Sequence, residues 1–171
     1  SQVPRPFSYL SSQLCAREMG DTKCRLCDAA ERASEVVLFE TPLVRIVKVD
    51  KYAGDGFPVY LKVVCNLHKK EMSDLDTDEE RHEIFRAVYA CEKALLKTDF
   101  FQPKCDKVNI ASFANMLPHI HWHVIGRYEI DVKWPGTFWS EKTRERNELV
   151  VKEMDNLVHE LSNFFAKELK C

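Results

Sequence analysis

The sequence predicts a single α+β domain, in which five short strands form the sheet and one long helix packs at its centre. Three observations support this class. Five stretches rich in Val, Ile and Phe have strand lengths, one amphipathic segment lies between the third and the fourth of them, and turn-forming residues separate the stretches. The chain has 171 residues, of which 45% are hydrophobic, and this is enough to build one packed core.

The first three strands are expected over residues 35–40, 43–49 and 59–65. A Thr-Pro pair separates the first two strands, because proline cannot donate a backbone hydrogen bond within a sheet. Residues 52–58 contain two glycines and a proline and therefore predict a loop before the third strand.

The central helix is expected to begin in the acidic run 73–80 and to end near residue 96. Acidic side chains are favoured in the first turn of a helix, and apolar residues recur at helical spacing through the rest of the segment. Two more strands, over 107–113 and 120–128, are expected to pair as an antiparallel hairpin. Apolar residues again recur at helical spacing over 140–170, which predicts a long C-terminal helix.

The domain boundaries follow from this pattern. Residues 1–22 are expected to form an N-terminal extension with a short helix around 11–19, residues 23–139 the main domain, and residues 140–171 the C-terminal helix. The apolar stripe of that helix should be covered, either by the domain itself or by a second subunit.

Charge and composition exclude several classes of protein. The net charge of −2 gives no bulk attraction to nucleic acid polymers, and no apolar run is long enough to span a membrane. The seven cysteines are an odd number, and the start of the sequence lacks the apolar run of a signal peptide. These features predict a reducing, cytoplasmic setting.

Three histidines alternate with apolar residues at His119, His121 and His123. Successive side chains of a strand point to opposite faces, so a strand here would present all three imidazoles on one face and apolar residues on the other. Such a cluster could bind a metal or transfer a phosphoryl-type group through an imidazole nucleophile, or it could be an inert solvated face.

Cys24 and Cys27 form a Cys-x-x-Cys pair. This spacing lets two thiolates reach one metal ion, although a redox pair or a coincidence remains open from the spacing alone.

The histidine motif resembles the signature of the histidine triad (HIT) family, which alternates His with apolar residues and ends in two apolar positions. Residues 119–125 fit that signature at every position, and Asn109, Asn115 and Arg127 lie where the family has similar polar groups. The segment 134–139 looks like the loop that follows the triad in bacterial-type members, including diadenosine polyphosphate hydrolases.

The resemblance, which runs from Cys24 to about Trp139, implies a HIT-like five-stranded antiparallel sheet that binds a nucleotide. By this likeness His121 would be the nucleophile that attacks the α-phosphate, and His123 would contact the phosphate or assist the leaving group. Asn115 and Asn109 would donate hydrogen bonds to phosphate or ribose. Asn115 stands where many members have Gln, so its shorter side chain departs from the family pattern.

Two further assignments come from the same resemblance. Asp50 lies near the position at which the family holds the ribose hydroxyls, although residues 51–58 lengthen the loop there. Some members carry zinc on a Cys-x-x-Cys pair, a histidine after the third strand and the first triad histidine. The chain supplies all four positions, which implies a structural zinc site formed by Cys24, Cys27, His68 and His119.

The implied function is hydrolysis of a phosphoanhydride or phosphoramidate bond, in a dinucleoside polyphosphate or a nucleoside phosphoramidate, through a nucleotidyl-histidine. The alternatives are a nucleotidyltransferase or phosphorylase of the same family, a non-catalytic nucleotide-binding regulator, and a zinc-stabilised interaction module. Family members are commonly dimers around the central helix, so a homodimer is expected.

Overall fold

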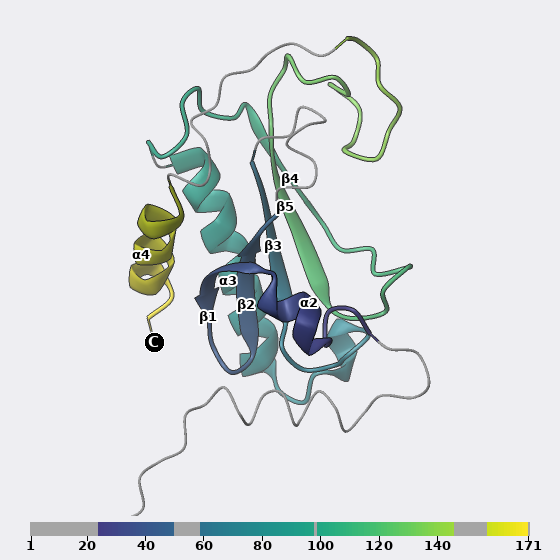
Figure 1. Cartoon of the computed structure of the whole chain (residues 1–171), viewed down its shortest axis with the longest axis vertical. Helices are drawn as coiled ribbons and strands as arrows, with labels where there is room; N and C mark the ends of the chain where they lie inside the picture. The colour runs from purple at the N-terminus through teal and green to yellow at the C-terminus, as the bar shows by residue number, and fades with distance from the viewer. Residues whose placement is uncertain (1–23, 50–58, 98, 146–156, 171) are drawn as a thin grey trace, which may run out of the picture.

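The computed structural model describes residues 24–49, 59–97, 99–145 and 157–170. Its sheet consists of five antiparallel strands in the order β1-β2-β3-β5-β4 (Figure 1). The strands are β1 (Val36–Glu40), β2 (Val44–Lys48), β3 (Tyr60–Cys65), β4 (Lys107–Ala111) and β5 (His121–Arg127). The predicted α+β class and the five predicted strands are confirmed.

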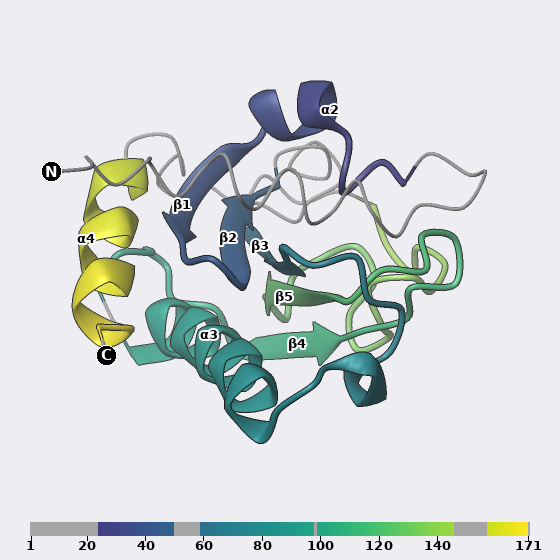
Figure 2. The ribbon, with the colours of Figure 1, turned by 90° about the horizontal axis from the view of Figure 1, so that it is seen from below.

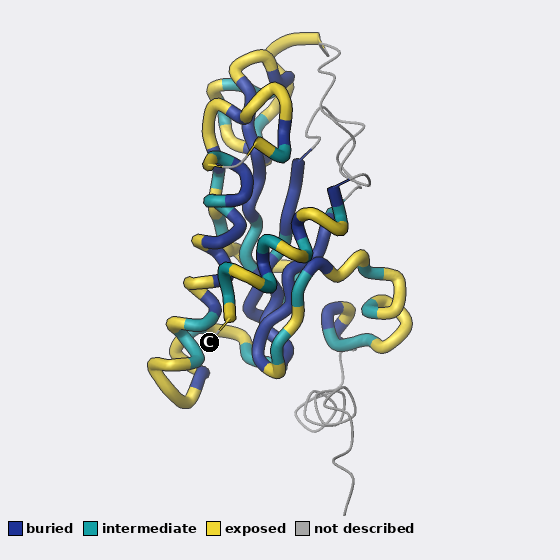
Figure 3. Tube along the Cα trace, turned by 90° about the vertical axis from the view of Figure 1, so that its left-hand side faces the viewer, coloured by how far each residue is buried: buried dark blue, intermediate teal, exposed yellow. Residues whose placement is uncertain are grey.

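The central helix α3 (Asp78–Lys97) lies across one face of the sheet (Figure 2). Its buried side chains pack on the apolar side chains of the strands and form the main core with them. Helix α4 (Val158–Glu168) contacts β1 and α3 and adds Leu161 and Phe165 to the same core. Figure 3 shows the burial along the strands and the exposure of the connecting segments.

The C-terminal helix differs from the prediction of one long helix over 140–170. Residues 140–145 are not helical, and residues 146–156 lie outside the described part of the chain. Tertiary hydrogen bonds override the helical pattern, because Thr143 donates its backbone N–H to the carbonyl oxygen of Val132 and Arg144 donates to those of Glu129 and Trp134. The short helix expected around 11–19 also lies outside the described residues.

Two short helical elements were not predicted. Helix α2 (Ala29–Ala33) begins at Asp28, whose carboxylate accepts hydrogen bonds from the N–H groups of Ala30 and Glu31. The 3₁₀ helix η2 (Met72–Asp74) lies between β3 and α3. Both elements are too short for a periodic pattern to reveal them.

The face of the sheet opposite α3, which we call the histidine face, carries the polar residues of β3 and β5. In the register of these strands Lys62 lies opposite His123 and Val64 lies opposite His121. Side chains of directly paired residues point to the same face, so β3 and β5 present their polar groups together. Within the described residues, no helix is long and apolar enough to cross a membrane.

Candidate functional site

The cysteine loop (residues 24–28) brings Cys24 and Cys27 to one side of a tight turn. The carbonyl oxygen of Cys24 accepts hydrogen bonds from the N–H groups of Cys27 and Asp28, at 3.0 and 3.1 Å. Cys24 and Leu26 pack on Val47 and Val64, which belong to the histidine face. The loop is therefore fixed against the sheet beside the histidines.

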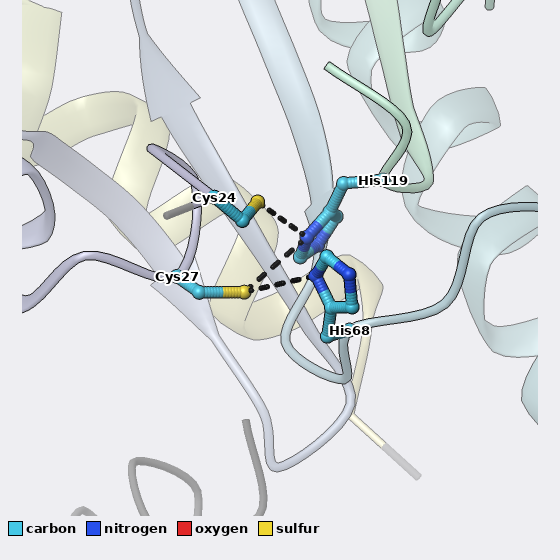
Figure 4. Close-up of side chains that lie close together, drawn as sticks. All are labelled: Cys24, Cys27, His68 and His119. Atoms are coloured by element: carbon cyan, nitrogen blue, oxygen red, sulfur yellow. Dashed lines mark hydrogen bonds between the residues drawn. The ribbon is translucent and has the colours of Figure 1, made fainter. Parts of the chain in front are cut away.

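Cys24, Cys27, His68 and His119 form one cluster, although they come from three separate places in the sequence (Figure 4). Their possible ligand atoms all lie within 4.8 Å of one another. The Nδ1 atom of His119 lies 3.4 Å from the sulfur of Cys24 and 3.4 Å from that of Cys27. The Nδ1 atom of His68 lies 3.4 Å from the sulfur of Cys27.

These distances fit a tetrahedral zinc site. With Zn–S bonds of about 2.3 Å and Zn–N bonds of about 2.0 Å, tetrahedral angles separate sulfur and nitrogen ligands by roughly 3.5 Å. Two cysteines and two histidines are a common ligand set for structural zinc. The four residues could therefore hold a metal ion, as predicted.

The protonation of His119 also suits a metal ligand. Its Nε2 atom lies 2.7 Å from the backbone carbonyl oxygen of Cys65, which can only accept a hydrogen bond. The proton of the neutral ring is therefore on Nε2, and the lone pair of Nδ1 points to the cysteines. Burial is the main cause that lowers the pKa of His119, to about 4.

Cys27 is disulfide-bonded in this structure, whereas Cys24 is a free thiol. Zinc binds cysteine as a thiolate. The complete ligand set therefore requires the reduced form of Cys27.

Arg45, on β2, joins the cysteine loop to the sheet. Its buried guanidinium donates to the carbonyl oxygen of Leu26 and to the side-chain oxygen of Asn66, both at 2.9 Å, and forms an ion pair with Glu35 at 2.7 Å. Leu26 lies between the two cysteines, and Asn66 lies two residues before His68. One side chain thus contacts both the cysteine loop and the segment that leads to His68.

His121 is the first residue of β5 and is buried. Its Nδ1 atom lies 2.6 Å from the backbone carbonyl oxygen of His119. Because this oxygen only accepts, Nδ1 carries the proton and Nε2 keeps a free lone pair. Burial is the main cause that lowers the pKa of His121, which favours the neutral ring.

The ring of His123 lies between His121 and two side chains of β3. The ring centroids of the two histidines are 5.0 Å apart, and the hydroxyl group of Tyr60 forms a hydrogen bond with Nδ1 of His123. Lys62 is the residue paired with His123 in the sheet. Burial, then His121 and Lys62, lower the pKa of His123 to about 4.

Aromatic side chains form a wall beside His123. The ring of Trp139 lies 5.4 Å from that of His123 and 4.7 Å from that of Phe113, while Phe138 contacts Trp139 and Tyr60 edge-on. Trp139 and Phe113 are about half exposed, so their rings remain accessible to a planar ligand.

The post-β5 loop (residues 128–145) is held by Arg127. The buried guanidinium of Arg127 binds both carboxylate oxygens of Asp131, at 2.7 and 3.0 Å, and donates to the carbonyl oxygen of Gly136 at 3.0 Å. It also donates to the side-chain oxygen of Asn109 at 2.6 Å. The side-chain oxygen of Asn109 is therefore engaged by Arg127, and its NH₂ group is the part that could contact a ligand.

The structure brings most of the predicted residues to the histidine face. His119 differs in detail, because it precedes β5 rather than lying within it, and only His121 and His123 alternate on the strand itself. Asn115 is exposed on the β4–β5 connection, directly after Ala114, whose φ of +48° is unusual for a residue other than glycine. Asp50 lies outside the described residues.

Sequence reasoning missed Tyr60, Lys62 and Arg45. Tyr60 and Lys62 alternate along the third strand as the histidines alternate along the fifth. That alternation could have marked them as sharing a face with each other, but only the register of β3 against β5 shows which residues they meet.

The arrangement combines an imidazole with an unprotonated Nε2, a second neutral imidazole, a lysine and amide donors. An unprotonated imidazole can act as a nucleophile toward phosphorus, and the cation and the donors can bind anionic oxygen atoms. The metal cluster lies at the start of the same strand and can fix the position of His121 through the His119 backbone.

This chain resembles a known family in sequence and solved proteins in fold. The sequence model of the HIT domain matches residues 30–130, more than half of the chain. A solved histidine triad protein from Bradyrhizobium japonicum is similar to this chain, with 20% identity, a TM-score of 0.57 and coverage of 84% of this chain and 96% of that one. No curated protein matches the chain in sequence.

Two more solved histidine triad proteins share the fold. The one from Marinobacter aquaeolei has 20% identity and a TM-score of 0.54, with coverage of 81% of this chain and 90% of that one. The one from Sinorhizobium meliloti has 19% identity and a TM-score of 0.53, with coverage of 82% and 94% respectively. At this level of identity the likeness shows the common fold.

Proposed function

This chain belongs to the HIT domain family, and on that premise we propose that it is a nucleotide hydrolase that works through a nucleotidyl-histidine. The observation that carries the proposal is the hydrogen bond from Nδ1 of His121 to the carbonyl oxygen of His119. It leaves the lone pair of His121 on Nε2 at neutral pH. The same face of the sheet carries Lys62 and His123, which could bind phosphate oxygens.

The proposed reaction has two steps at one phosphorus atom. First, the Nε2 lone pair of His121 forms a P–N bond to the α-phosphorus, while the bond to the leaving group breaks and its electron pair departs with the leaving group. Second, water forms a P–O bond and the P–N bond breaks, which returns the electron pair to His121 and releases a proton. The products are a nucleoside monophosphate and the leaving group.

The neighbouring residues have supporting roles in this proposal. His123 contacts the phosphate oxygens or assists the leaving group, and Asn109 and Asn115 donate hydrogen bonds to phosphate or ribose. Asp50 is proposed for the ribose hydroxyls. Donors of this kind act most strongly where negative charge accumulates in the transition state.

The proposed substrates are dinucleoside polyphosphates such as diadenosine tetraphosphate, with nucleoside phosphoramidates as the second class. The paired rings of Phe113 and Trp139 favour a substrate that offers a base close to the reacting phosphate. A transferase or phosphorylase would use the same first step and replace water by another acceptor. A nucleotide-binding regulator would use the site without the P–N bond.

The substitution His121→Asn tests the enzymatic proposal. We expect turnover of diadenosine tetraphosphate to fall by at least about 10³-fold, because the nucleophile is removed, while nucleotide binding persists. The control is His159→Asn, which changes an exposed histidine on α4. Unchanged turnover in His121→Asn would contradict the nucleophile assignment, and binding without turnover in the unsubstituted protein would favour the regulator.

We also propose that the cluster of Cys24, Cys27, His68 and His119 holds a structural zinc ion. When bound, zinc would supply a fixed tetrahedral link between the cysteine loop and the start of β5. The residues themselves place His119 so that its backbone carbonyl oxygen accepts a hydrogen bond from the Nδ1–H group of His121. The site requires both cysteines in the reduced form, which agrees with the proposed cytoplasmic location.

Metal analysis of protein purified under reducing conditions tests this site. We expect about one zinc per chain, and Cys24→Ser should bind zinc much more weakly. The control is Cys91→Ser, which removes a buried free thiol from α3, outside the cluster. Less than about half a zinc per chain, or equal zinc in Cys24→Ser, would contradict the proposal.

The proposed assembly is a homodimer built on α3 and on β4, an edge strand of the sheet. On α3, Phe85 and Tyr89 are 47% and 60% exposed, and on β4 Ile110 is 39% exposed. An exposed strand edge beside exposed aromatic side chains suits a second copy of the chain, which could extend the sheet and cover the rings. Within each chain we propose the domain 23–139 with the N-terminal extension 1–22 and the C-terminal segment 140–171.

Light scattering coupled to gel filtration tests the dimer. The variant Tyr89→Arg should elute as a monomer, because a charge at the interface is costly to bury. The control is Ile130→Arg, which changes an exposed apolar residue of the post-β5 loop. A monomeric mass for the unsubstituted protein would contradict the proposal.

A further inference from the structure

Tyr60 is a buried tyrosine whose hydroxyl group points to the proposed active site. The residue is 2% exposed, and its ring packs edge-on against Phe138, with ring centroids 5.6 Å apart. Its hydroxyl group forms a hydrogen bond with Nδ1 of His123. The contact is long-range in sequence and exists because β3 and β5 are neighbours, with Tyr60 opposite Ile125.

The chemistry of the two groups sets the direction of this bond. A phenol is a better proton donor than a neutral imidazole N–H, and the unprotonated imidazole nitrogen is a good acceptor. The ring of His123 is kept neutral by burial and by the nearby groups on both strands, His121 on β5 and the ammonium group of Lys62 on β3. Tyr60 therefore donates, and Nδ1 of His123 accepts.

From this geometry we propose that Tyr60 is a positioning residue, which fixes His123 as the tautomer that carries its proton on Nε2. In a neutral imidazole only one nitrogen carries hydrogen. If Nδ1 accepts the hydrogen bond from Tyr60, the hydrogen must therefore be on Nε2. The inference rests on the proposed function, in which the Nε2–H group of His123 donates a hydrogen bond to the substrate.

The tautomer matters because the two histidines then have opposite roles. His121 donates through Nδ1 and offers its lone pair at Nε2, whereas His123 accepts at Nδ1 and offers a hydrogen at Nε2. One ring is thereby set as a nucleophile and the other as a hydrogen-bond donor to an anionic phosphate or leaving-group oxygen. His123 keeps its proton in this role, because a phosphate leaving group departs as an anion.

The position of Tyr60 suits this role. The neighbouring rings of Phe138 and Trp139 contact each other. Phe138 also contacts Tyr60, and Trp139 contacts His123, so each ring packs on one partner of the hydrogen bond. Tyr60 and Phe138 are 2% and 4% exposed, so the hydroxyl side of this bond lies in buried, apolar surroundings. A hydrogen bond in such surroundings is stronger than one in water.

The variant Tyr60→Phe removes the hydroxyl group and keeps the ring. The matched control is Tyr128→Phe, because Tyr128 is equally buried and its hydroxyl has no hydrogen-bond partner among the described residues. The first readout is two-bond ¹H–¹⁵N correlation spectra of ¹⁵N-labelled protein without substrate near neutral pH, which distinguish Nδ1–H from Nε2–H rings.

In the unsubstituted protein and in Tyr128→Phe we expect His123 as a single Nε2–H tautomer, and in Tyr60→Phe a mixture of both tautomers. A protonated Nδ1 on His123 in the unsubstituted protein would overturn the proposal even if Tyr60→Phe failed to fold. An unchanged single tautomer in Tyr60→Phe would overturn it as well.

The second readout is turnover of diadenosine tetraphosphate. We expect Tyr60→Phe to lower kcat roughly 10-fold to 100-fold with KM unchanged, because the donor is misoriented while binding contacts remain. Unchanged kcat together with mixed tautomers would overturn the positioning role. Absence of turnover in the unsubstituted protein would contradict the proposed hydrolase instead, and the spectra would still decide the tautomer.

Discussion

At the scale of single residues, a buried arginine holds the segments that carry the proposed zinc ligands. Arg45 contacts the backbone of the cysteine loop, the side chain of Asn66 two residues before His68, and Glu35. Such a planar group with several donors can hold three partners in one geometry. The metal ligands are therefore positioned by a residue that does not belong to the ligand set.

The variant Arg45→Met tests this role. It keeps much of the side-chain length but loses all donors, so we expect the affinity for zinc to fall roughly 10-fold to 100-fold, as for other partners of metal-site residues. Competition with a chromophoric chelator under reducing conditions measures the affinity. The control is Arg25→Met in the same loop, because Arg25 is exposed and pairs with exposed Glu31. Equal affinities in the two variants would contradict the role of Arg45.

The pKa of His123 predicts a pH dependence of stability. Burial, then His121 and Lys62, lower its pKa to about 4 in the folded chain, whereas an unfolded histidine has a pKa near 6.5. The unfolded chain therefore takes up the proton first, and the stabilising contribution is complete above about pH 6.5 and is lost as the pH falls toward 4.

The variant His123→Asn lacks this contribution. We expect its free energy of unfolding, measured with urea at several pH values and equal zinc occupancy, to fall less steeply with acidification than that of the unsubstituted protein. The variant His159→Asn should keep the original slope, since His159 lies exposed on α4. Identical slopes for His123→Asn and the unsubstituted protein would rule out this account of His123.

At the scale of elements, one ion pair holds the post-β5 loop on the sheet. Arg127 ends β5 and Asp131 lies in the loop, and the two side chains are each 1% exposed. Arg127 also holds the carbonyl oxygen of Gly136, three residues before Trp139. The aromatic wall beside His123 therefore depends on this buried pair.

We expect Asp131→Asn to lower the free energy of unfolding by about 3–5 kcal/mol, because it leaves a buried guanidinium without its carboxylate. Urea unfolding measures the loss. The control is Asp78→Asn, which breaks an exposed pair with Arg81 and should cost less than about 1 kcal/mol. Equal losses in both variants would show that the buried pair has no special importance.

The elements differ in how well the sequence predicted them. All five strands were predicted because each is a short apolar stretch between turn-forming residues, and α3 because its pattern extends over many turns. The segment 140–145 was wrongly predicted as helical, since the bonds of Thr143 and Arg144 to the post-β5 loop are tertiary and leave no local signal. Helix α2 depends on a single capping residue, Asp28.

At the scale of the whole molecule, the sheet order brings the site together. Because β3 and β5 are neighbours, residues of β3 meet the histidines of β5, and the cysteine loop packs on the same face. The ligands of the proposed metal site could be predicted from the family resemblance. The contact of Tyr60 with His123 could not, because alternation gives the faces of a strand but not its register with another strand.

The central claim is that His121 forms a covalent bond to phosphorus. The most direct measurement is intact-protein mass spectrometry of reaction mixtures with diadenosine tetraphosphate, quenched within the first turnover under alkaline conditions that preserve a P–N bond. The account predicts a protein mass increased by one adenylyl group, located on His121 by peptide mapping and absent in His121→Asn. Turnover without any such adduct, or an adduct that persists in His121→Asn, would contradict the account.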